Sequence, residues 1–143
     1  MTKSENTVAR DTAFKPGFRL SVLDVLVLIA GAVGSWLLGA ETWWAGALVA
    51  FVVGHFFLFC NVFRIARMPE LIWAGAFVLL SSATILGGFP GWPVTFGTSL
   101  LLTCVLIARE MRKPSYHGIA WQRVNPDLRK WWDSAMSGNK TPH

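Results

Sequence analysis

Residues 51–67 read FVVGHFFLFCNVFRIAR, a nearly continuous apolar run that ends in Arg64 and Arg67. Such a run is typical of a membrane-crossing helix, because about 20 apolar residues at about 1.5 Å each cover a hydrocarbon layer of about 30 Å. The run holds His55, while the other two histidines lie in the polar C-terminal tail. Its basic end indicates on which side of the membrane the next loop lies.

The composition favours a membrane protein over a soluble one. Of 143 residues, 53% are hydrophobic, and they come in blocks too long for a soluble core. A net charge of +5 would suggest nucleic-acid binding in a soluble protein. Because the Lys and Arg residues flank apolar blocks, we instead expect contact with the lipid bilayer and no nucleic acid. Cys60 and Cys104 lie inside apolar runs, which predicts small buried side chains rather than a disulfide or metal pair.

Four apolar segments predict an all-α integral membrane protein with four transmembrane helices. These helices cover about residues 20–40, 43–63, 69–86 and 94–108. The first segment follows a polar tail and ends with Leu38 and Ala40 where a cleaved signal would need two small residues, so we expect it to be retained. Pro69 and Glu70 suit the first turn of the third helix.

The distribution of positive charge predicts the topology. Of 13 Lys and Arg residues, four precede the first helix, two separate the second from the third, and seven follow the fourth. The positive-inside rule then places both termini in the cytoplasm, in a multi-pass protein of the cytoplasmic (inner) membrane. The predicted organisation is a polar cytoplasmic tail, a transmembrane domain and a basic cytoplasmic tail, over residues 1–19, 20–108 and 109–143.

The basic tail predicts one short amphipathic helix at about residues 126–136. Asn125 suits its N-cap, and Pro126 suits its first turn. Its apolar side chains recur at helical spacing, at Leu128, Trp131, Trp132, Ala135 and Met136. We expect this interfacial helix to lie on the lipid surface, and docking onto a partner protein is the alternative.

Small residues predict how the first two helices pack. The predicted packing positions are Gly31 and Ser35 on the first helix and Gly46, Ala50 and Gly54 on the second. Residues four apart share a helix face, and small ones let two backbones approach closely. The short connection at residues 41–42 predicts an antiparallel hairpin, in which the numbers of facing residues sum to about 83.

Four residues make up a candidate intramembrane polar site, namely Asp24, His55, Asn61 and Arg64. The hairpin pairing places Asp24 near Asn61 or Arg64, close to the membrane edge, which favours a structural clamp. Proton or cation binding by Asp24 is the alternative. His55 lies deeper and is a candidate functional group, unless it is a neutral histidine that hydrogen-bonds a neighbouring helix. The hydroxyls that we consider for that bond are those of Ser81, Ser82 and Thr84.

The sequence gives little support for an enzyme. It has no nucleophile–base pair, no phosphate loop and no metal-ligand spacing, so we expect no catalytic residue, metal or cofactor. The favoured function is that of an accessory, assembly or structural subunit, which packs against other membrane proteins or itself. The alternative is a small self-associating transporter or channel, in which Asp24 and His55 bind ions or protons.

Overall fold

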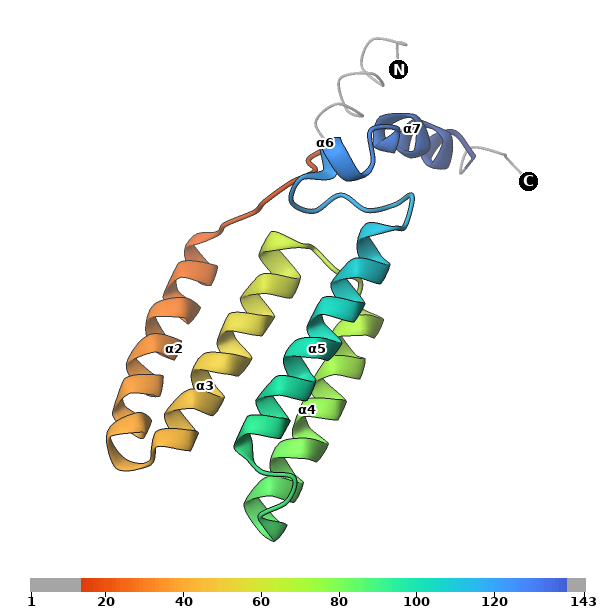
Figure 1. Ribbon diagram of the computed structural model, residues 1–143. Coiled ribbons are helices and arrows are strands. Elements are labelled where there is room, and N and C mark those ends of the chain that lie inside the picture. The colour runs from red at the N-terminus through yellow and green to blue at the C-terminus, as the bar shows by residue number, and fades with distance from the viewer. Residues whose placement is uncertain (1–13, 139–143) are drawn as a thin grey trace, which may run out of the picture.

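The structure is a computed structural model that describes residues 14–138, and within these residues it is helical, without strands (Figure 1). The four long helices are α2 (Val22–Glu41), α3 (Trp43–Phe57), α4 (Arg67–Gly87) and α5 (Trp92–Met111). A π-helix, η1 (Leu58–Val62), continues α3 without a break. Two short helices, α6 (Trp121–Val124) and α7 (Leu128–Gly138), follow.

The all-helical fold and the four long apolar helices that the sequence predicts are confirmed. Helix α2, α3 together with η1, α4 and α5 are each 20 or 21 residues long and apolar enough to cross a membrane. At about 1.5 Å per residue, each reaches about 30 Å, the thickness of a hydrocarbon core. Most of the predicted N-terminal tail, residues 1–13, lies outside the described residues, as do residues 139–143.

The fourth long helix is longer at both ends than the predicted 94–108. Helix α5 begins at Trp92 with Pro93 in its first turn, where a missing N–H costs no helical hydrogen bond. It continues to Met111, past the charged residues Arg109 and Glu110, and the carboxylate of Glu110 is paired with Lys113 at 2.5 Å.

The start of the amphipathic helix also differs from the prediction. Helix α7 begins at Leu128, two residues after the predicted Pro126. The predicted N-cap at Asn125 is wrong, because its side-chain amide donates to the carbonyl oxygens of Pro114 at 2.5 Å and Tyr116 at 3.3 Å. Asn125 therefore ties the segment before α7 to the loop that follows α5.

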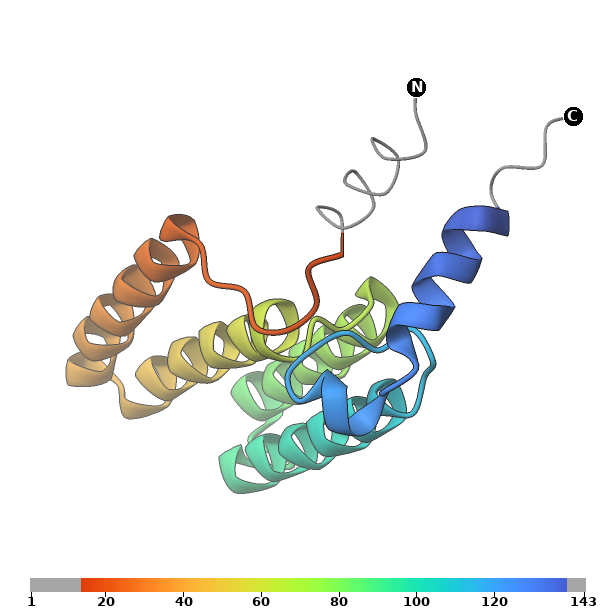
Figure 2. The ribbon, with the colours of Figure 1, turned by 90° about the horizontal axis from the view of Figure 1, so that it is seen from above.

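The long helices form two antiparallel hairpins, α2–α3 and α4–α5 (Figures 1 and 2). Seen from above, α2 lies at the edge of the bundle and packs on α3. The core lies between the other three helices, where Phe59, Trp73, Phe77 and Leu106 are buried. No residue of α2 is buried, so this helix presents most of its surface to its surroundings.

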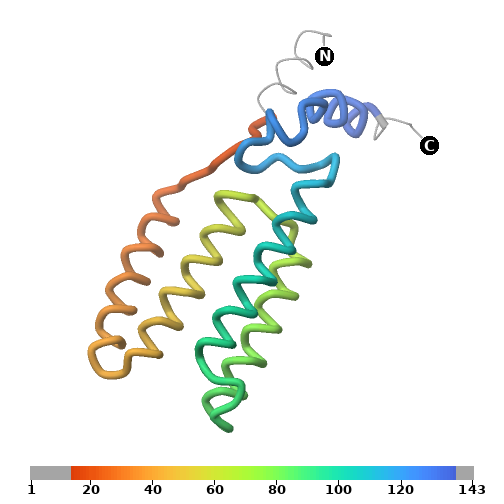
Figure 3. Tube along the Cα trace, in the orientation of Figure 1, coloured from red at the N-terminus to blue at the C-terminus, as the bar shows by residue number. Residues whose placement is uncertain are grey.

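One end of the bundle is covered by loops and short helices, which we call the end cap and define as residues 14–20, 62–66 and 112–138. The chain before α2 runs towards α6 there (Figure 3). Backbone hydrogen bonds join its three segments, from the N–H of Gly17 to the carbonyl of His117 (2.7 Å) and from that of Ile119 to Val62 (2.9 Å). Segments far apart in the sequence thus form one unit.

Candidate functional site

Asp24 begins α2 as part of a capping box. Its Oδ2 accepts hydrogen bonds from the backbone N–H and the hydroxyl of Ser21, both at 2.7 Å, and its own N–H donates to the Ser21 hydroxyl at 3.2 Å. This arrangement satisfies N–H groups that a helix start leaves free, and it sets a carboxylate at the positive end of the helix dipole. Ser21 was not among the predicted partners of Asp24, although the two residues have the spacing of a capping box.

Asn61 connects this cap to the second helix. When its amide is oriented with the nitrogen towards the acceptors, Nδ2 donates to Asp24 Oδ2 at 3.1 Å and to the carbonyl of Arg19 at 3.0 Å. The structure therefore brings Asp24 and Asn61 together, as the hairpin pairing predicts. Arg64 is not part of this cluster, because its guanidinium donates to the carbonyl of Lys15 at 2.6 Å.

His55 lies in a different environment, inside the aromatic core. It is 8% exposed and stacks on Trp73, with ring centroids 4.6 Å apart and an angle of 11° between the planes. Its Nδ1 lies 2.8 Å from the carbonyl oxygen of Phe51, one turn earlier. Since a carbonyl only accepts, this bond places a proton on Nδ1. The expected hydrogen bond from His55 to a hydroxyl of α4 is wrong, because His55 bonds a carbonyl of its own helix.

The hydroxyls of α4 and α5 have partners of their own. The Oγ1 atoms of Thr84 and Thr95 lie 2.8 Å apart in the buried contact between the two helices. The hydroxyls of Ser81, Ser99 and Thr103 donate to backbone carbonyls of their own helices. Ser82 is exposed. These hydroxyls therefore join α4 to α5 or satisfy themselves, as is common in membrane helices.

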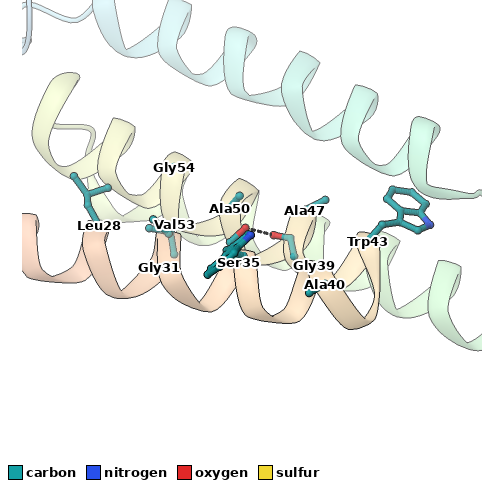
Figure 4. Close-up of a pocket in the computed structure, with 13 residues that line it drawn as sticks. Leu28, Gly31, Ser35, Gly39, Ala40, Trp43, Ala47, Ala50, Val53 and Gly54 are labelled. Atoms are coloured by element: carbon teal, nitrogen blue, oxygen red, sulfur yellow. Dashed lines mark hydrogen bonds between the residues drawn. The ribbon is translucent and has the colours of Figure 1, made fainter.

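The predicted small-residue face is where α2 meets α3. The hydroxyl of Ser35 donates to the carbonyl of Gly46 at 2.8 Å (dashed line in Figure 4). A Cβ on Gly46 would lie 2.5 Å from the backbone carbonyl oxygen of Ser35 and 2.6 Å from the Cα of Gly39, so a side chain has no room there. A Cβ on Gly31 would lie 2.8 Å from a methyl group of Val53. Three of the five predicted packing positions are thus at the contact.

The other two positions, Ala50 and Gly54, lie along an open groove between the same helices (Figure 4). A Cβ on Gly54 would have no neighbour within 4 Å, and Ala50 is exposed. The groove encloses about 780 Å³ and continues past Gly31 and Ser35 towards Trp43. Small residues on α3 therefore leave an open groove along the surface of the bundle.

The predicted interfacial residues of α7 are divided between protein and surroundings. Leu128 is 0% exposed, so it lies inside the protein and does not face lipid. Trp132 is half-buried, and its ring meets that of Phe14 edge-on at 5.7 Å, whereas Trp131 remains 38% exposed. The apolar face of α7 is thus partly covered by the chain's own N-terminal linker, which neither proposed alternative anticipated.

The cysteines are also placed differently from the expectation. Cys60 and Cys104 are both exposed free thiols, so the prediction that they are buried is wrong. Within residues 14–138, no three His, Cys, Asp or Glu side chains gather closely enough to hold a metal ion. No protein-family model, curated protein or solved structure matches the chain.

Proposed function

We propose that this chain is a non-enzymatic accessory or assembly subunit that packs against another protein within the membrane. The observation that carries the proposal is the exposure of α2. This helix is the first of the four candidate spans, and it has no buried residue. Beside it runs the open groove of small residues that ends near Gly54. The groove and the exposed face of α2 together form a surface suited to a transmembrane helix of a partner protein.

The chemistry of such a surface differs from that of a soluble interface. Lipid tails are as apolar as Leu, so helices associate in membranes through close packing and not through the hydrophobic effect. Close packing needs small residues, and Ala47, Ala50 and Gly54 supply them along the wall that α3 contributes to the groove. A partner helix would gain backbone contacts there that lipid chains make less well.

The placement of the two ionisable groups supports packing over transport. Asp24 is engaged by Ser21 and Asn61 at the start of α2. His55 is stacked between aromatic rings and bonded to Phe51. Neither residue lines the α2–α3 groove or the two pockets of the end cap. A transporter that used both residues would need a shared water-filled path between them.

The proposal includes an orientation, with the end cap in the cytoplasm and the α2–α3 and α4–α5 turns on the other side of the inner membrane. The support is the charge distribution, because Lys and Arg are confined to the termini, the α3–α4 connection and the adjoining helix ends. The opposite turns carry no Lys or Arg. They carry aromatic anchors instead, where Trp44 and Trp92 stack at 5.1 Å.

Labelling of single cysteines tests this orientation. In a variant with both native cysteines replaced, we expect a membrane-impermeant maleimide to label Phe89→Cys in right-side-out spheroplasts and Ser137→Cys in inside-out vesicles. Both positions are exposed, Phe89 at 79%, and they lie at opposite ends of the bundle. Labelling of both cysteines from the same side, or the reverse pattern, would contradict the proposed topology.

The docking surface is tested by affinity purification in a mild detergent, with identification of the co-purified membrane proteins. A Cβ at Gly54 meets nothing within 4 Å, so Gly54→Leu extends into the open groove, and we expect the partner to be lost while thermal stability stays at the wild-type level. Gly75→Leu is the matched control, because Gly75 of α4 also has no neighbour within 4 Å and does not line the groove. Asp24→Asn should keep the partner.

Two outcomes would overturn the proposal. One is a wild-type protein that purifies only as copies of itself, which would favour the self-associating transporter. The other is an equal loss of the partner in Gly54→Leu and Gly75→Leu, since a specific groove cannot respond equally to changes on two different helices.

A further inference from the structure

The end cap contains a small pocket whose charged lining is entirely basic. It encloses about 230 Å³ and is lined by Lys15, Arg19, Arg64, His117 and Trp132, with the ring of Phe14 beside them. These residues come from the linker before α2, the loop after η1, the loop after α5, and α7. No single sequence motif produces this pocket, because folding of the end cap gathers the cations.

The fold holds the guanidinium groups of Arg19 and Arg64 near each other, which costs backbone strain at Arg64 and repulsion between the two charges. Arg64 has a left-handed backbone conformation, with φ at 49°, and its side chain is anchored by the bond to the Lys15 carbonyl. Burial and the neighbouring charge of Arg19 lower the pKa of Arg64. Among the described residues, no carboxylate forms an ion pair with Lys15, Arg19 or Arg64.

Nearby carboxylates have partners of their own. Asp24, which attracts Arg19, is bonded to Ser21 and Asn61. Glu70 and Glu110 line an adjoining pocket of about 510 Å³ that shares Arg64, His117 and Trp132 with the basic pocket. Glu110 is paired there with Lys113, and Glu70 accepts from the thiol of Cys60. The basic pocket thus keeps a positive charge that the described part of the chain does not neutralise.

A second observation points to a missing acceptor. The indole Nε1 of Trp132 is buried and has no hydrogen-bond partner among the described residues. Buried donors without a partner are rare in folded proteins, because each forfeits the hydrogen bond that water would give. Trp132 lines the basic pocket, so an anion there would bring acceptor oxygens close to this residue.

We propose that this pocket binds a phosphate group, carried either by an anionic lipid headgroup or by free phosphate. Guanidinium forks match the oxygens of a phosphate, and basic pockets at the membrane edge accept lipid headgroups. The pocket adjoins the start of α2, where the first span enters the membrane. This inference goes beyond the accessory role and does not depend on a partner protein.

The test measures thermal unfolding and retained lipid in the purified full-length protein. The wild type is placed in nanodiscs of phosphatidylcholine, with or without phosphatidylglycerol, and separately in detergent with or without inorganic phosphate. Stabilisation by phosphatidylglycerol alone identifies a headgroup site, and stabilisation by inorganic phosphate identifies a site for a free anion. Either result supports the phosphate pocket, provided that the variants below abolish it.

Three variants locate the effect. Trp132→Phe keeps an aromatic ring at this half-buried position and removes the partnerless N–H with the five-membered ring, so we expect stability without anion close to the wild type and severalfold weaker anion binding. Arg19→Gln and Arg64→Gln together should weaken binding about 25-fold, at about fivefold for each charge. The control changes Arg112 and Arg123 to Gln, because both are exposed tail cations that do not line the pocket.

The proposal fails if neither anion stabilises the wild type. It also fails if the Arg112 and Arg123 control loses as much binding as the pocket variant, because the effect would then come from net charge alone. If the Arg64 change unfolds the end cap, Trp132→Phe still decides the question, and unchanged binding in that variant would overturn the site.

Discussion

Replacement of Gly46 by alanine is expected to separate α2 from α3 and to destabilise the protein by about 3 kcal/mol. Overpacking usually costs about 1 to 3 kcal/mol, and the upper end applies when the obstructing atoms belong to the backbone. The three atoms nearest to the new Cβ are all backbone atoms, the carbonyl oxygen of Ser35 and the Cα and N of Gly39. Separation would also break the hydrogen bond from Ser35 to Gly46, worth about 0.6 kcal/mol in membrane helices.

Equilibrium unfolding in mixed detergent measures this loss, and spin labels on exposed positions of α2 and α3 measure the separation. Gly54→Ala is the control, since a Cβ at Gly54 meets nothing within 4 Å and alanine favours a helix over glycine. We expect the control to be as stable as the wild type or slightly more so. Equal behaviour of the two alanine variants would show that α2 does not approach α3 at Gly46.

The α2–α3 contact could be predicted from the sequence because two local signals agree. The connection at residues 41–42 is too short for anything except an antiparallel hairpin, and small residues recur at every fourth position on the second helix. These signals placed Asp24 near Asn61, where the structure has it. The length of the apolar segments and the positions of Lys and Arg between them predicted four long helices, and the structure confirms that number.

The exposed cysteines show what such signals cannot reveal. In water, an apolar residue is expected inside the protein, but in a membrane lipid is as apolar as a neighbouring helix. The apolar context of Cys60 and Cys104 therefore could not tell a lipid-facing position from a buried one. The same ambiguity hides which side of α2 is free, and only the packed structure shows that none of its residues is buried.

The end cap was missed for a different reason. Its hydrogen bonds join residues far apart in the chain, such as Gly17 with His117 and Ile119 with Val62, and no local periodicity encodes such pairs. The π-helix η1 also has no sequence signature that separates it from an α-helix. Its bond from the N–H of Phe63 to the carbonyl of Leu58 spans five residues, and it carries two buried residues, one in the aromatic core and one at α2.

Replacement of Trp73 by alanine is expected to be the most damaging change in the second hairpin, at about 3 kcal/mol or more. Trp73 is 4% exposed and stacks on His55 and on Phe77, at 4.6 and 5.3 Å. Its Nε1 also donates to the carbonyl of Ser99 at 3.2 Å, which links α4 to α5. Removal of a buried Trp or Phe side chain typically costs about 3 to 5 kcal/mol.

Two companion variants separate the causes of this loss. Trp73→Phe keeps most of the packing and removes the bond to Ser99, so its cost should be about 1 kcal/mol. Trp36→Ala, at a tryptophan that is 77% exposed on α2, should change the unfolding free energy by less than about 0.5 kcal/mol. If Trp73→Ala proves no worse than Trp36→Ala, the aromatic core does not hold the three helices together. A large loss would instead show that the aromatic core joins α3, α4 and α5, as expected if α2 presents its open face to the partner that we propose.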